Sequence, residues 1–115
     1  MKALISIDYT NDFVATDGKL TTGAAGQAIE TALVQQTKHY FDNGDFVVFA
    51  IDGHDPLDRY HPENKLFPPH NVLGTDGRNL FGSLADFYQP SIFKPGTKIQ
   101  SDFCTRLFCV VYRIF

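Results

Sequence analysis

The sequence predicts an α/β protein built on a parallel sheet, and three observations carry this prediction. Residues 3–7 and 46–51 are short, almost continuous apolar runs, which are typical of strands buried on both faces. Between them, residues 24–42 place apolar side chains at helical spacing. Strand, helix and strand in this order form a βαβ unit, in which the two strands run parallel.

Each element has its own signal along the chain. The first strand ends at Asp8, and turn residues at 17–18 and 21–23 separate it from the helix. The helix is expected to end at Asn43-Gly44, because glycine readily adopts the left-handed conformation that stops a helix. Its apolar face is expected to consist of Ile29, Leu33, Thr37, Tyr40 and Phe41.

The second strand ends at Asp52, so that Asp8 and Asp52 lie at the carboxyl ends of adjacent strands, where open α/β sheets place their active sites. Residues 53–79 form a long connection, which is uncommon unless it is functional. A short helix is expected over 80–88. A third strand could start at residues 91–93, and residues 109–115 have strand propensity.

Composition limits the class of protein. The chain has 115 residues, which favours a single domain, and its net charge of −3 argues against a nucleic-acid binder. No apolar stretch reaches the roughly 20 residues of a membrane helix, and no signal peptide is recognised. Two cysteines make neither a disulfide framework nor a zinc ribbon, so a soluble cytoplasmic protein is expected.

The long connection holds the strongest candidate for a metal site. Asp52 and His54 are two residues apart at a strand end, so their side chains point the same way, and His70 follows two prolines that stiffen the loop. With a fourth ligand from His61 or Glu63, this set suits Zn²⁺, Fe²⁺ or Mn²⁺. The alternative is that these are ordinary polar residues of a surface loop.

Asp8 is the second candidate. Partial burial at the strand end would raise its pKa and make it a general base, whereas the alternative is a capping or turn residue. Lys94 follows the third apolar run and could lie near Asp8, although by itself it is more simply a solvated lysine.

Two motifs resemble a known family. Residues 3–13, Ala-Leu-Ile-Ser-Ile-Asp-Tyr-Thr-Asn-Asp-Phe, look like the opening of the isochorismatase-like cysteine hydrolases, and of nicotinamidases in particular. Asp52-x-His54 followed by Phe67-Pro68-Pro69-His70 is similar to the nicotinamidase metal motif. The resemblance covers roughly residues 1–89. It implies a Rossmann-like three-layer parallel sheet that is incomplete here, with only the N-terminal βαβ half present.

The balance of charge changes at the point where the resemblance ends. Residues 1–90 hold 6 basic and 12 acidic residues, whereas residues 91–115 hold 4 and 1. We therefore expect residues 1–115 to be one truncated domain, family-like over 1–89 and divergent over 90–115. Out-of-frame coding could produce such a tail.

Site residues follow from the resemblance position by position. Asp8 matches the catalytic base, and Lys94 is our choice for the catalytic lysine, with Lys98 as its rival. Phe13 and Phe67 match the aromatic residues that sandwich the pyridine ring of the substrate. The implied metal ligands are Asp52, His54 and His70, with Glu63 as the candidate for the fourth and His61 as its alternative.

The implied reaction is the hydrolysis of nicotinamide to nicotinate and ammonia, as in the salvage of NAD. In the family, Asp takes the proton of a Cys thiol, the thiolate attacks the amide, ammonia leaves and water hydrolyses the thioester. A divalent metal docks the pyridine ring, with Zn²⁺ as first choice and Fe²⁺ or Mn²⁺ as alternatives.

The nucleophile is where this sequence departs from the family. Cys104 is ten residues past Lys94 and lacks the small, apolar run expected before it, and Cys109 sits inside a strand-like run. Little or no amidase activity is therefore expected. The alternative functions are a catalytically dead truncated or frameshifted fragment, or a module that binds a metal or a partner. We also expect a homo-oligomer, since one face of the sheet would stay bare.

Overall fold

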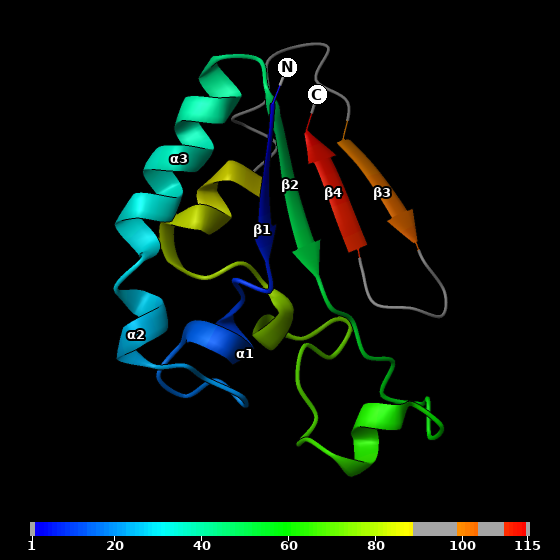
Figure 1. Cartoon of the computed structure of the whole chain (residues 1–115). Helices are drawn as coiled ribbons and strands as arrows, with labels where there is room; N and C mark the ends of the chain where they lie inside the picture. The colour runs from blue at the N-terminus through cyan, green and yellow to red at the C-terminus, as the bar shows by residue number, and fades with distance from the viewer. Residues whose placement is uncertain (1, 89–98, 104–109, 115) are drawn as a thin grey trace.

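The structure, a computed structural model, describes residues 2–88, 99–103 and 110–114 (Figure 1). Strands β1 (Ala3–Ile7) and β2 (Phe46–Ile51) pair in parallel, with Ala3 opposite Phe46 and Ile7 opposite Ala50. The predicted βαβ unit is therefore confirmed, and both strands end at the same edge of the sheet.

Two further strands complete the sheet. Strands β3 (Ile99–Phe103) and β4 (Val110–Ile114) give the order β1-β2-β4-β3. β4 runs antiparallel to both of its neighbours, with Val47 of β2 opposite Ile114. Strand propensity over 109–115 is confirmed in β4, but its direction and the existence of β3 were not predicted from the sequence. The third strand expected from residues 91–93 lies outside the described residues.

The single helix predicted over residues 24–42 is interrupted. Helix α2 covers Ala24–Gln27, and helix α3 covers Glu30–Asp42. The hydroxyl of Tyr9 donates a 2.8 Å hydrogen bond to the carbonyl oxygen of Gly26, the group that would accept from Glu30 in a continuous helix. Glycine also has a low helix propensity. The predicted stop is confirmed, since Gly44 has a φ of +71° just after α3.

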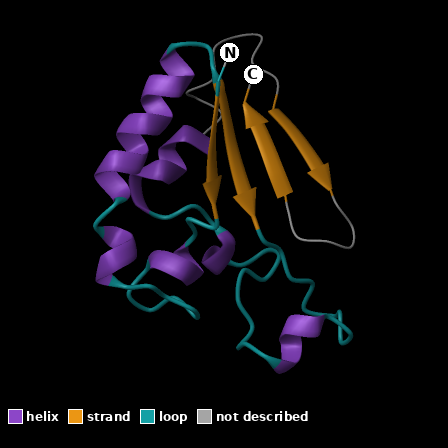
Figure 2. Cartoon of the chain, in the orientation of Figure 1, coloured by secondary structure: helices purple, strands orange, loops and turns teal. Residues whose placement is uncertain are grey.

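The helical layer packs on one face of the sheet (Figure 2). Thr37 of α3 is fully buried, and Leu33, Tyr40 and Phe41 pack against the core as predicted. Ile29 does not, because it precedes α3 at the break and is 52% exposed. The short helix expected over 80–88 is the 3-10 helix η3 (Gly82–Tyr88). The buried apolar core consists of Tyr9, Val14, Val47, Phe49, Ile51, Leu80 and Leu84.

The opposite face of β1 carries exposed apolar side chains. Ile5 and Ile7 are 58% and 71% exposed. The predicted bare face is therefore present on β1. None of the described helices has the length and apolar character needed to cross a bilayer.

Three short helices lie beyond the ends of β1 and β2, at the lower edge of the sheet in Figure 1. They are α1 (Asn11–Val14) and the 3-10 helices η1 (Pro62–Lys65) and η2 (Asp76–Arg78). The long connection after β2 therefore returns to this edge, where it meets the residues that follow β1.

Candidate active site

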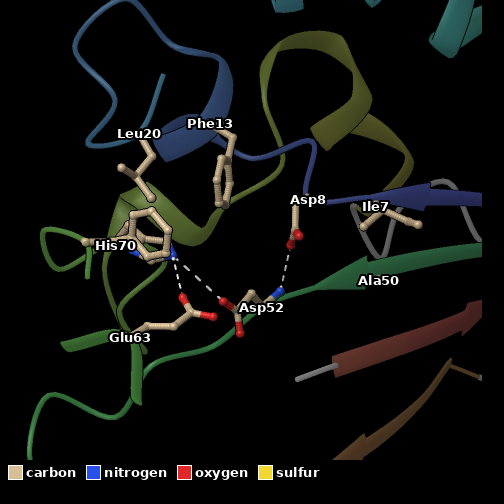
Figure 3. Close-up of a pocket in the computed structure, with 9 residues that line it drawn as sticks. Ile7, Asp8, Phe13, Leu20, Ala50, Asp52, Glu63 and His70 are labelled. Atoms are coloured by element: carbon tan, nitrogen blue, oxygen red, sulfur yellow. Dashed lines mark hydrogen bonds and ion pairs between the residues drawn. The ribbon is translucent and has the colours of Figure 1, made fainter. Parts of the chain in front are cut away.

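Two acidic residues, Asp8 and Asp52, lie side by side where the parallel strands end. Asp8 follows β1 with a φ of +52°, a left-handed conformation that turns the chain sharply out of the strand. Its backbone N–H still donates to the carbonyl oxygen of Ala50 in β2, at 2.9 Å. Its Oδ1 accepts a 2.9 Å hydrogen bond from the N–H of Asp52 (Figure 3). The ends of the two strands thus fix Asp8 beside Asp52.

Asp52 is also one of four side chains that converge at this edge of the sheet. Oδ2 of Asp52 lies 2.6 Å from Nε2 of His54 and 3.9 Å from Nε2 of His70. Oε2 of Glu63, on η1, lies 3.7 Å from Nε2 of His54 and 3.6 Å from Nε2 of His70. One donor atom from each of the four residues lies within 4.8 Å of every other. This spacing lets all four donors reach a single cation.

The chemistry of the donors fits a divalent metal. His70 is buried, and its Nδ1–H donates to the carbonyl oxygen of Pro68 at 2.9 Å, because a carbonyl can only accept. This hydrogen bond fixes the tautomer and leaves the lone pair of Nε2 directed at the carboxylates. Two imidazoles and two carboxylates form a mixed nitrogen and oxygen set, which suits Zn²⁺, Fe²⁺ or Mn²⁺.

The structure separates the two candidates for the fourth ligand. Glu63 lies within the cluster, whereas Nδ1 of His61 accepts a 3.3 Å hydrogen bond from the N–H of Glu63 and so caps η1. The His61 ring packs edge-on against His54, with centroids 4.5 Å apart. His61 thus supports the turn that presents Glu63.

A pocket of about 430 Å³ opens between the cluster and Asp8. This volume is in the range of small-molecule sites. The Phe13 ring meets His70 edge-on with a centroid distance of 5.4 Å, and the Phe67 ring does so at 6.2 Å. Figure 3 shows Phe13, His70 and the carboxylates turned toward a common space. The lining residues are Ile7, Asp8, Phe13, Leu20, Ala50, Asp52, Glu63, Phe67 and His70.

Burial raises the pKa of Asp8 above its ordinary value of 3.8. Desolvation is the largest cause, because it disfavours the charged carboxylate. The hydrogen bond from the N–H of Asp52 lowers the pKa of Asp8 in part, while the negative charges of Asp52 and Glu63 raise it. Asp8 is therefore a carboxylate that takes up a proton more readily than a solvated one.

Known proteins resemble the chain over most of its length. No model of a protein family matches it. A curated protein of Bacillus subtilis strain 168, an uncharacterized isochorismatase family protein called PncA, is 58% identical over 94 residues. The match covers 82% of this chain and 51% of that protein. Over this stretch the chain is similar to a member of the isochorismatase family. The resemblance predicted from the two motifs is confirmed.

Solved structures agree with this similarity. A pyrazinamidase/nicotinamidase of Streptococcus mutans UA159 is 65% identical with a TM-score of 0.74, and 76% of this chain covers 49% of that one. The nicotinamidase/pyrazinamidase PncA of Bacillus subtilis is 54% identical, with the same TM-score and the same shares. The chain spans about half the length of the relatives it matches.

Several residues predicted for the site lie outside the described part of the chain. Lys94, its rival Lys98 and the two cysteines, Cys104 and Cys109, fall in the ranges 89–98 and 104–109. The structure brings together the other residues that the sequence predicted for the site. They are Asp8, Phe13, Asp52, His54, Glu63, Phe67 and His70.

Sequence reasoning missed three supporting side chains. Leu20 lines the pocket from the turn after α1. Nε of Arg78 donates to the carbonyl oxygen of Asp52 at 2.9 Å. Asp12 accepts from the N–H of Asn71, 59 residues away, at 2.7 Å. Contacts this distant in the sequence leave no periodic signal, and the only hint was the presence of Asp12 inside the N-terminal motif.

Proposed function

We propose that this chain carries the metal-binding, base and ring-binding part of an amide hydrolase that converts nicotinamide to nicotinate and ammonia. The convergence of Asp52, His54, Glu63 and His70 beside a pocket that also contains Asp8 is the observation that supports this most directly. The solved relatives, described as pyrazinamidase/nicotinamidase and nicotinamidase/pyrazinamidase, support the same substrate class.

The four converging residues would hold a divalent metal, with Zn²⁺ as the first choice and Fe²⁺ or Mn²⁺ as alternatives. When bound, the metal would supply a docking point for the nitrogen of a pyridine ring. The protein's own part is to present the donors in a fixed arrangement. The hydrogen bond from His70 to Pro68 and the cap that His61 gives to η1 both serve this purpose.

The rings of Phe13 and Phe67 are suited to hold a flat aromatic substrate. Both line the pocket and both lie edge-on to His70. Aromatic side chains bury much apolar area and stack on other rings, so they favour a pyridine over an aliphatic amide. The substrate's carboxamide would then point toward Asp8, which lines the same pocket.

Asp8 would act as the general base. Its raised pKa favours taking a proton from a thiol, whose thiolate sulfur then bonds to the amide carbon. The carbon–nitrogen bond breaks, ammonia leaves with the proton returned from Asp8, and water hydrolyses the thioester. Lys94, or Lys98, remains the predicted cation that stabilises the thiolate.

A second candidate is a module that binds a metal and a pyridine without turning it over. No thiol borders the pocket among the residues that the structure describes. The nucleophile is therefore the component of the reaction that the described site leaves open, with Cys104 and Cys109 as the cysteines of this sequence.

Ammonia release from nicotinamide by the purified, Zn²⁺-loaded chain separates the two candidates. The Cys104→Ser, Cys109→Ser and double variants serve as controls, and nicotinamide binding is followed by calorimetry on the same samples. Ammonia release that disappears in one cysteine variant supports the hydrolase and identifies its thiol. Metal-dependent binding without ammonia supports the binding module, and absence of both contradicts the proposal as a whole.

Association with a second copy and a cytoplasmic location belong to the same proposal. Exposure of Ile5 and Ile7 on the uncovered face of β1 supports self-association, because exposed apolar patches favour burial against a partner. Light scattering on the eluting protein measures the oligomeric state, and a monomer at all concentrations contradicts this part.

A further inference from the structure

A buried carboxylate lies outside the pocket and has no part in the proposed chemistry. Asp12, in α1, is 7% exposed and is not among the lining residues. Its Oδ2 accepts a 2.7 Å hydrogen bond from the backbone N–H of Asn71, and its Oδ1 accepts a 3.3 Å hydrogen bond from the backbone N–H of Lys19. Gly77 packs so closely that a Cβ there would overlap the Asp12 carboxylate. Asp12 is thus held in place on several sides.

Asn71 has an unusual backbone conformation. Its φ is +42°, in the left-handed region that asparagine tolerates better than most residues. Asn71 is fully buried, and its Oδ1 accepts a 2.8 Å hydrogen bond from the hydroxyl of Thr10. Its Nδ2 has no hydrogen-bond partner among the described residues. Asn71 therefore contributes its left-handed backbone conformation, its backbone hydrogen bonds and its acceptor Oδ1 to the fold.

The backbone of Asn71 connects the two histidines among the four candidate metal ligands. Its carbonyl oxygen accepts a 3.1 Å hydrogen bond from the N–H of His54, and His70 is the preceding residue in the chain. A change in the conformation of Asn71 would consequently move both imidazoles together.

We infer that Asp12 is a positioning residue, which acts through Asn71 to hold His54 and His70 in the arrangement that a metal requires. The carboxylate suits this role because a charged acceptor makes a strong hydrogen bond to a buried N–H. Without it, the N–H of Asn71 would be buried and unpaired, and the left-handed conformation would lose its main support. The positioning role itself does not depend on the proposed function; only its expected effect on metal binding rests on the proposed metal site.

Two variants weaken this connection by different routes. Asp12→Asn removes the charge but keeps the shape, and Thr10→Val removes the hydroxyl that binds Asn71. Thr37→Val is the matched control, because Thr37 is as buried as Thr10 and its hydroxyl has no partner in the described part of the chain. Thr10→Ser keeps the hydroxyl that Thr10→Val removes, so this variant should behave like the wild type.

The first readout needs no metal. Solvent exchange of the His54 amide hydrogen is measured by NMR on the metal-free chain, with the Phe49 amide in β2 as an internal reference. We expect exchange at His54 to speed up in Asp12→Asn and Thr10→Val relative to Phe49, and to stay unchanged in Thr37→Val. Equal exchange at His54 in all variants would overturn the inference.

The second readout is Zn²⁺ affinity, determined by competition with a chelator, together with the visible spectrum of the Co²⁺-loaded chain. Asp12→Asn and Thr10→Val are expected to weaken Zn²⁺ binding by about 10- to 100-fold, as for other outer partners of metal ligands. Unchanged affinity and spectrum in both would overturn the inference, as would an equal loss in Thr37→Val. If the wild-type chain binds no Zn²⁺ but His54 exchange responds, the proposed function fails while the positioning role stands.

Discussion

The backbone N–H of Asp52 donates a 2.9 Å hydrogen bond to Oδ1 of Asp8. This contact joins the proposed base at the end of β1 to the first metal-cluster residue after β2. The left-handed turn at Asp8 makes it possible, because the side chain leaves the strand direction and meets the neighbouring strand end. The proposed base and this candidate metal ligand are therefore positioned by the same pair of parallel strands.

Replacing Asp8 with a neutral side chain should raise the stability of the chain at pH 7 while lowering its amide hydrolysis. Burial raises the pKa of Asp8, so the folded chain favours the protonated acid and loses stability as pH rises through the raised pKa. Asp8→Asn is always neutral and its Oδ1 can still accept from Asp52. We expect the variant to match the wild type near pH 3 and to be more stable at pH 7, in urea unfolding of the metal-free chains.

The same substitution should abolish most amide hydrolysis wherever the wild-type chain shows it. Loss of a general base lowers rates by about 10²- to 10⁴-fold. A variant that is less stable than the wild type at pH 7, or that keeps its activity, would contradict the assignment of Asp8 as a partly desolvated base.

The fourth ligand can be identified by a pair of substitutions. Glu63→Gln removes a carboxylate from the cluster and should weaken Zn²⁺ binding by at least about tenfold, since even outer partners of metal ligands have effects of this size. His61→Asn keeps an acceptor that can cap η1, so its Zn²⁺ affinity should stay within about twofold of wild type. Chelator competition measures both, and the reverse order would make His61 the ligand.

The proposed pyridine-binding role of Phe67 can be tested by comparison with its neighbour Leu66. Phe67 is 48% exposed and lines the pocket, whereas Leu66 is 71% exposed and does not. Phe67→Ala should weaken nicotinamide binding by about three- to tenfold, the usual range of an aromatic contact. Leu66→Ala should have no effect in the same calorimetric titration, and equal losses in both variants would count against a specific contact with the ring.

Gly77→Ala should destabilise the fold. The added Cβ would overlap the carboxylate of Asp12, which cannot move without losing its hydrogen bond to Asn71. Overpacking of this kind costs about 1–3 kcal/mol. Urea unfolding measures the loss, and an unchanged free energy of unfolding would show that Asp12 has room to shift.

The sequence predicted the parts of the site that follow from the ends of strands. Apolar runs that stop at Asp8 and Asp52 indicate where β1 and β2 end, and parallel strands bring these ends to one edge. Spacing could not decide between His61 and Glu63, because the choice depends on how the 3-10 turn η1 orients two nearby residues.

Other features depended on contacts that no local pattern records. The break between α2 and α3 reflects a hydrogen bond from Tyr9, 17 residues away. β4 runs antiparallel to both β2 and β3. Strand propensity indicates that a segment is extended, but it does not indicate the direction in which the strand pairs. The connection from Asp12 to Asn71 spans 59 residues, so it became visible only in the folded chain.

The central claim is that the four-residue cluster holds a metal at which the pocket receives a pyridine ring. Titration of nicotinamide into the Co²⁺-loaded chain, followed by the visible absorption of the metal, tests it most directly. We expect nicotinamide to shift the absorption bands and benzamide, which lacks the ring nitrogen, to leave them unchanged. Failure of the chain to bind Co²⁺, or an equal response to both amides, would contradict the claim.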